Sequence, residues 1–187
     1  MTARPPISLA HAVLYVRDLD KMIDFYSRVL GFEVSDRGPL GNRENSPEIV
    51  FLSQSPTDHH QIAFLPLRKD DTNRSNNVDH LAWRVASLDE VRRFRDLVSA
   101  EPEVSDITPM SHGNAWSVYF RDPEGNRHEI FCDSPFAVSQ PQGRAVDLDL
   151  SVEALTAATE AEFGGEPGFG ALEEYYAGRA ARLGSGS

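Results

Sequence analysis

Two stretches determine how the rest of the chain is interpreted, HAVLYVRDLDKMIDF (11–25) and HLAWRVASLDEVRRF (80–94). In both stretches a His is followed by Val five positions later, Leu eight, Asp nine and Phe fourteen positions later. Self-similarity at a fixed period is the mark of a repeated supersecondary unit. The sequence therefore predicts two copies of one unit.

The second half of each unit also aligns. The stretch IVFLSQSPTDHHQIAF (49–64) lies against SVYFRDPEGNRHEIF (117–131). This alignment matches Gln61 with Glu129 and Ile62 with Ile130. The repeat thus extends from the first strand of each unit to its last.

Each copy has the same pattern of predicted elements, a strand, a helix and three further strands. Alternating apolar residues predict the first strands, in HAVLYV and DHLAWRV. Capping residues, Asp18 or Asp20 and Ser87 or Asp89, then introduce the helices. The helices are expected at 19–30 and 88–99, and the later strands at 32–36, 48–53, 60–66, 103–107, 115–121 and 127–132. The fold class is therefore α+β, with two tandem βαβββ modules.

The modules fill the first part of the chain, residues 1–135. We expect them at about 8–68 and 78–134, with the polar stretch 69–77 as a hinge. Residues 136–187 form an acidic, partly helical C-terminal extension, with helices expected at 151–163 and 171–183. A lid over a pocket, a dimer arm and a packing extension are three open roles for it.

Composition excludes several classes of partner. The chain of 187 residues has a net charge of −11, which disfavours nucleic acid and anionic membrane surfaces. No apolar run is long enough to span a membrane, and the N-terminal residues lack the apolar core of a signal peptide. The single cysteine, Cys132, allows no internal disulfide. We therefore expect a cytoplasmic protein.

The repeat brings chemistry-bearing residues into equivalent positions. If the two copies pack around a pseudo-twofold axis, His11 and His80 meet across it, as do Gln61 and Glu129. Two imidazoles and one carboxylate with open positions are the ligand set of non-haem Fe(II) oxygenases, whereas the neutral amide of Gln61 is a poor ligand. The sequence has no HExxH motif and no CxxC pair, so other metal motifs are absent.

These residues lead to a family resemblance. The stretches HAVLYVRDLDKMIDFYSRVLGF, HHQIAFLPL, DHLAWRV and SVYFRDPEGNRHEIF resemble the vicinal oxygen chelate superfamily. Within it, the HHxIAF (59–64) and YFxDPxGNRxE (119–129) segments resemble the type I extradiol, ring-cleaving dioxygenases in a single-domain form. The resemblance covers residues 8–134 and implies a mixed-sheet pseudo-barrel around a metal site.

The resemblance also implies residue roles. His11, His80 and Glu129 would bind Fe(II), with Mn(II) as an alternative. His60 matches the acid–base histidine of the family, and Tyr119 matches a tyrosine that hydrogen-bonds the bound catecholate. If Gln61 occupies the point equivalent to Glu129, His60 faces away, unless the strand begins or bulges there.

Three further residues complete the predicted site. His112 resembles a histidine in the loop before the strand of Tyr119, although that loop is shorter here. Trp116 and Phe120 are expected to line the substrate pocket. The predicted reaction cleaves a catechol ring beside its diol with O₂, and a homodimer is the expected assembly.

Other functions remain open. A glyoxalase-like isomerase would need a second carboxylate at the position of Gln61, whereas an antibiotic-modifying transferase uses the same three ligand types. A metal-free drug-binding module and an interaction domain that uses the acidic extension are further alternatives.

Overall fold

The computed structural model describes residues 7–41, 45–69 and 78–184, and their contacts divide the chain into two compact units. The N-terminal unit comprises Pro6–Val78 and also Asp122–Asn126. The C-terminal unit contains Asp79–Arg121 and Arg127–Ser187, so the extension shares a unit with the second module. The expected hinge, 69–77, lies outside the described residues except for its first position.

The N-terminal unit has the predicted βαβββ order. Its sheet has the strand order β1-β4-β3-β2, in which β1 is parallel to β4 and the other pairs are antiparallel. Its elements are β1 (Ala12–Tyr15), α1 (Leu19–Asp24), the π-helical turn η1 (Phe25–Val29), β2 (Glu33–Pro39), β3 (Glu48–Ser53) and β4 (Ile62–Leu65).

Local signals explain both ends of the first helix. The Asp18 carboxylate accepts a hydrogen bond from the Lys21 backbone N–H at 3.0 Å, which satisfies one free donor of the first turn. The helical segment ends before Gly31, whose φ of +81° is the left-handed conformation that glycine adopts without steric cost. Both features confirm the predicted helix position.

One face of the N-terminal sheet carries the hydrophobic core. Tyr26 and Phe64 are fully buried, and their ring centroids lie 4.8 Å apart in an edge-on contact. Val50 and Leu52, which alternate along β3, are also fully buried. Because strand neighbours point to opposite faces, Phe51 is directed to the other face.

The C-terminal unit repeats this topology. Its sheet has the order β10-β6-β7-β8-β5, with β5 parallel to β8, so the first four-strand pattern recurs with one added edge strand. At the start of its helix the Ser87 hydroxyl accepts from the Glu90 backbone N–H at 3.3 Å, and the Glu90 carboxylate accepts from the Ala86 backbone N–H at 2.6 Å. The elements are β5 (Leu81–Arg84), α2 (Leu88–Ser99), β6 (Ser105–Ser111), β7 (Ala115–Arg121), β8 (Arg127–Asp133), β9 (Phe136–Ala137), β10 (Arg144–Ala145) and β11 (Gly170–Ala171).

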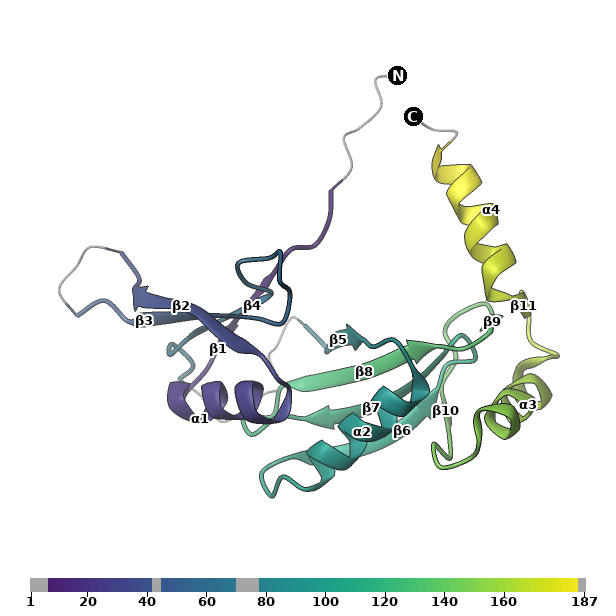
Figure 1. Cartoon of the computed structure of the whole chain (residues 1–187), viewed down its shortest axis with the longest axis horizontal. Helices are drawn as coiled ribbons and strands as arrows, with labels where there is room; N and C mark the ends of the chain where they lie inside the picture. The colour runs from purple at the N-terminus through teal and green to yellow at the C-terminus, as the bar shows by residue number, and fades with distance from the viewer. Residues whose placement is uncertain (1–6, 42–44, 70–77, 185–187) are drawn as a thin grey trace. The chain divides into compact units, whose positions relative to one another are not determined.

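The two predicted helices of the extension are confirmed as α3 (Val152–Phe163) and α4 (Leu172–Gly184). Phe163 of α3 is fully buried, and the Thr159 hydroxyl accepts a hydrogen bond from the Trp116 indole at 2.9 Å. Helix α3 therefore belongs to the core of its unit, as a packing extension does. Helix α4 extends away from the sheet (Figure 1). No described helix is long and apolar enough to cross a membrane.

The turn between β7 and β8, Asp122–Asn126, belongs to the N-terminal unit. The Asp122 carboxylate accepts hydrogen bonds from the backbone N–H groups of Glu124 and Asn126 and from the Tyr26 hydroxyl. The Glu124 carboxylate accepts from the backbone N–H groups of Arg17 and Asp18 at 2.7–2.9 Å. The predicted turn thus holds the residues that precede α1.

Candidate active site

His80 and Glu129 face each other in the C-terminal unit. His80 comes directly before β5, and Glu129 lies on the neighbouring parallel strand β8. The distance from His80 Nε2 to Glu129 Oε2 is 3.5 Å. His80 Nδ1 lies 2.7 Å from a carboxylate oxygen of Asp79, which can only accept, so Nδ1 carries the hydrogen. In the neutral ring the lone pair is then on Nε2, on the side of Glu129.

His112 and Tyr119 complete this cluster. Tyr119 lies opposite Glu129 in the antiparallel register of β7 and β8, and His112 lies in the turn between β6 and β7. His112 Nε2 is 3.0 Å from the Tyr119 hydroxyl and 3.3 Å from Glu129 Oε1. The structure thus brings together four of the predicted site residues, including His112 despite its shorter loop.

The environment shifts the pKa values of three of these groups. The hydrogen bond with Glu129 is the largest influence on His112 and raises its pKa above 6.5. Burial alone would raise the pKa of Glu129, but hydrogen bonds from His112 and Tyr119 outweigh it and lower that pKa. Burial, with the charge of Glu129, raises the pKa of Tyr119 well above its usual value. At neutral pH the cluster therefore holds a carboxylate and a protonated phenol.

His11 and His60 lie together in the N-terminal unit. Their ring centroids are 4.3 Å apart, and the Phe51 ring is 4.8 Å from His60. Strand β4 begins at Ile62, so His60 precedes the strand, and strand alternation does not direct its side chain away. Burial, followed by the charges of His11 and His59, lowers the pKa of His60 below 6.5.

Gln61 has a structural contact. Its side-chain oxygen accepts a hydrogen bond from the Gln54 backbone N–H at 2.9 Å. This contact occupies the oxygen, which is the only atom of the neutral amide that could ligate a metal ion. Gln61 is therefore a loop-bracing residue in this structure.

The predicted ligands fall into two groups, His80 with Glu129 in one unit and His11 in the other. Within the described ranges, no set of three or more His, Cys, Asp or Glu side chains is arranged to hold a metal ion. The complete ligand set of His11, His80 and Glu129 stays a prediction.

Trp116 and Phe120 require a correction. They alternate with Tyr119 along β7, so they point to the opposite face of the sheet. Trp116 is 3% exposed and donates to Thr159, and Phe120 is fully buried and stacks on His128. Both are core residues of the C-terminal unit and do not line a substrate pocket with Tyr119.

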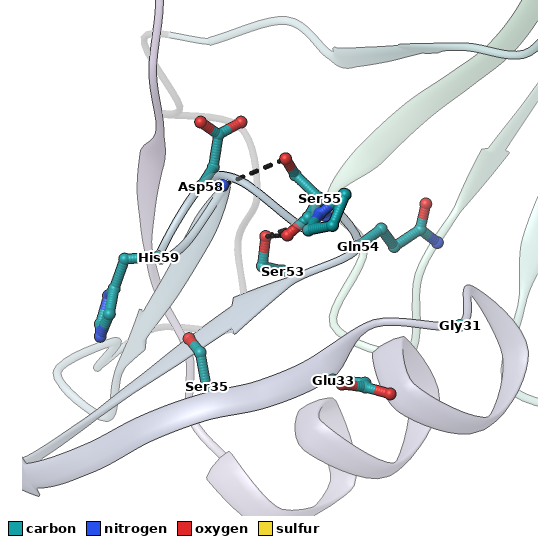
Figure 2. Close-up of a pocket in the computed structure, with 9 residues that line it drawn as sticks. Gly31, Glu33, Ser35, Ser53, Gln54, Ser55, Asp58 and His59 are labelled. Carbon is teal, nitrogen blue, oxygen red and sulfur yellow. Dashed lines mark hydrogen bonds between the residues drawn. The ribbon is translucent and has the colours of Figure 1, made fainter.

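A pocket of about 540 Å³ lies in the N-terminal unit, beside the loop that carries His59 (Figure 2). The hydroxyl groups of Ser53 and Ser55 are engaged in hydrogen bonds of that loop. The carboxylates of Glu33 and Asp58 point away from each other (Figure 2). Because its polar groups do not converge, we do not assign the chemistry to this pocket.

Two contacting residues were not predicted. Asp79 orients His80 and lies 3.1 Å from Arg127, whose guanidinium lies 4.5 Å from the centroid of the Tyr119 ring. Asp79 precedes a predicted ligand directly, and that position is a signal for an outer-shell carboxylate. The other contact is the Gln142 carbonyl on His112, and a backbone acceptor leaves no signal in the sequence.

Comparisons with known proteins identify relatives of this chain. The family model described as the glyoxalase/bleomycin resistance protein/dioxygenase superfamily matches residues 8–130. The chain is 29% identical over 128 residues to a metapyrocatechase of Pseudomonas sp. (strain CF600), which covers 67% of this chain and 39% of that protein. It is 32% identical over 145 residues to biphenyl-2,3-diol 1,2-dioxygenase 3 of Rhodococcus globerulus, covering 72% and 66% of the two chains.

A solved structure supports the fold. The glyoxylase/bleomycin resistance protein/dioxygenase domain from Frankia sp. EAN1pec superposes with a TM-score of 0.56 at 20% identity. The match covers 70% of this chain and 100% of that domain. The mixed α+β architecture with two related sheets is therefore shared with a known fold.

Proposed function

Because the chain belongs to the glyoxalase/bleomycin resistance protein/dioxygenase superfamily, we propose that it is an extradiol dioxygenase that cleaves a catecholic ring beside the diol with Fe(II) and O₂. The observation that supports this function best is the convergence of His80, Glu129, His112 and Tyr119 in one cluster. The names of the two curated relatives, a metapyrocatechase and a biphenyl-2,3-diol 1,2-dioxygenase, support the same reaction class.

The donor atoms of the C-terminal unit fit a divalent metal ion. Two ligands at about 2.1 Å from one ion, at right or slightly wider angles, lie roughly 3.0–3.5 Å apart. His80 Nε2 and Glu129 Oε2 are 3.5 Å apart, and His80 has its other nitrogen fixed by Asp79. In this proposal His80 and Glu129 hold the ion, and His11 completes the ligand set. A bound Fe(II) would supply Lewis acidity to the diol and a redox partner for dioxygen.

The remaining residues handle protons. The lowered pKa of His60 keeps its imidazole neutral at pH 7, so it can accept a proton from a catechol hydroxyl and return it when the ring opens. The raised pKa of Tyr119 keeps its hydroxyl protonated, so it can donate a hydrogen bond to a substrate oxygen. The raised pKa of His112 favours its doubly protonated ring, which can donate from Nε2 to the same developing charge. Both atoms of O₂ enter the product.

The test is a turnover assay on a panel of catechols. The purified protein is loaded with Fe(II) without oxygen and then mixed with air and each catechol. Ring cleavage beside the diol yields a yellow muconic-semialdehyde-type product, with O₂ consumed in equal amount. The variants His80→Ala and Glu129→Gln should lose this activity, whereas Glu153→Gln, at an exposed carboxylate of α3, should retain it.

Other outcomes would redirect the assignment. Stoichiometric metal without any ring cleavage would favour an isomerase or transferase of the same superfamily. The engaged amide of Gln61 argues against the isomerase, which needs a second carboxylate at that position. Absence of metal binding would favour a drug-binding module. Catechol and O₂ as partners, a homodimer and a cytoplasmic location are further parts of this proposal.

A further inference from the structure

Residues 139–143 of the C-terminal extension pass beside His112, and we call this segment the strap. The family model ends at residue 130, so the strap lies beyond the residues that this model matches. A Cβ atom added to Gly143 would lie 3.9 Å from His112 Nδ1, so the strap runs against the imidazole ring.

The contact with the strap fixes a hydrogen on Nδ1 of His112. His112 Nδ1 is 2.5 Å from the Gln142 carbonyl oxygen. A carbonyl only accepts hydrogen bonds, so Nδ1 must be the donor. In the neutral ring Nε2 then accepts from the Tyr119 hydroxyl at 3.0 Å, and in the doubly protonated ring Nε2 donates to Glu129 at 3.3 Å.

Gln140 fastens the strap to the turn that carries His112. Its side-chain nitrogen donates to the His112 carbonyl at 2.8 Å and to the Asn114 side-chain oxygen at 3.1 Å. Its side-chain oxygen accepts from the Gln142 backbone N–H at 2.8 Å. The Gln140 side chain thus connects the backbone of His112 to the backbone of Gln142, whose carbonyl binds the His112 ring.

We propose that Gln140 is a positioning residue, and that through it the strap selects the Nδ1–H tautomer of His112 and directs Nε2 toward Tyr119 and Glu129. The partner of one ring nitrogen sets the state of the other, and outer-shell partners of this kind affect activity. The catalytic consequence rests on the proposed ring-cleaving function, whereas the tautomer does not depend on it. The C-terminal extension thereby contributes to the site.

The chain offers a matched pair of variants. Gln140→Ala removes all three strap contacts of that side chain. Gln142→Ala keeps the backbone carbonyl that binds His112 and loses only a side-chain contact to the Ser139 carbonyl at 3.2 Å. Gln140→Glu keeps the acceptor for Gln142 but places a carboxylate against two acceptor oxygens, so it serves as a second variant if Gln140→Ala does not fold.

The first readout is the ¹⁵N spectrum of the histidine rings in the full chain without added metal. The chain has six histidines, and a His112→Asn spectrum identifies the His112 signals. We expect Nδ1 to be protonated in the wild type and in Gln142→Ala, and the Nε2–H form to become populated in Gln140→Ala. An unchanged tautomer in both Gln140 variants would overturn the inference.

The second readout is turnover of the Fe(II)-loaded protein. We expect kcat of Gln140→Ala to fall roughly 10-fold, the lower end of outer-shell effects, with little change in KM and with Gln142→Ala like the wild type. A tautomer shift with unchanged kcat would overturn the positioning role. Loss of the wild-type reaction itself, with the tautomer as expected, would instead refute the proposed function.

Discussion

Glu124 offers the sharpest test of how the fold is held together. Its carboxylate is 2% exposed and accepts hydrogen bonds from the backbone N–H groups of Arg17 and Asp18. The guanidinium of Arg68, 7% exposed, lies 3.6 Å from the same carboxylate. The change Glu124→Ala would remove the acceptor of the Arg17 and Asp18 backbone N–H groups. It would also remove the carboxylate that faces the buried Arg68 guanidinium.

The expected decrease in the free energy of unfolding follows from the loss of two hydrogen bonds and one ion pair. Each donor left without its charged acceptor costs about 1–3 kcal/mol, and breaking a buried ion pair costs about 3–5 kcal/mol by itself. The terms overlap because Arg68 keeps its bond to the Glu124 backbone carbonyl at 2.8 Å. We therefore expect a loss of about 4 kcal/mol in the free energy of unfolding. For a chain of this length the melting temperature should fall by about 10 °C.

Thermal and urea unfolding measure the loss, and amide hydrogen exchange localises it. The Arg17 and Asp18 amides should exchange faster in Glu124→Ala. The control is Glu33→Ala, which removes an exposed carboxylate from the edge strand β2 and should change stability by less than about 0.5 kcal/mol. If Glu124→Ala melts like Glu33→Ala, the assigned role of the turn is wrong.

Three further predictions follow from groups described above. The raised pKa of His112 means that its contact with Glu129 stabilises the metal-free protein below pH 6.5, and this contribution is lost as pH rises through the folded pKa. The melting-temperature difference between wild type and His112→Gln should therefore shrink as the pH rises from ~5.5 to ~9. A difference that stays constant over this range would contradict the assignment. Trp116→Phe, which loses the hydrogen bond to Thr159, should lower the free energy of unfolding by roughly 1–3 kcal/mol and leave the KM for catechol unchanged. A changed KM at full stability would instead indicate that Trp116 lines the substrate pocket. Burial raises the pKa of the Cys132 thiol to about 11, so a thiol reagent at pH ~8 should label it only after unfolding, and rapid labelling of the native protein would contradict its burial.

The repeat predicted the fold well because each half is built from local patterns. The predicted ranges 48–53, 88–99 and 115–121 coincide with β3, α2 and β7. The fourth strand is shorter than expected, since it begins at Ile62, and this difference removes the conflict over the orientation of His60. Periodicity and caps therefore located most elements, whereas the strand expected at 103–107 is β6, Ser105–Ser111.

The site was predictable only where a residue type carries its own chemistry. His80, Glu129 and Tyr119 have side chains that suggest ligation or proton transfer, and the structure brings them together. Trp116 and Phe120 were misjudged because aromatic type does not tell which face of a strand a residue occupies. The contact between Gln142 and His112 spans 30 positions and uses a backbone carbonyl, so no sequence motif indicates it.

The turn Asp122–Asn126 also has a consequence for the order in which the protein folds during synthesis. The N-terminal unit needs Glu124 to satisfy the backbone next to α1 and Asp122 to satisfy Tyr26, yet these residues leave the ribosome long after β4. During synthesis the first module therefore lacks these hydrogen bonds until most of the second module has been translated. Contacts over such sequence separations slow folding, because a long loop must close before they form. A nascent chain arrested before residue 122 should remain sensitive to proteases, and one released beyond residue 126 should become resistant.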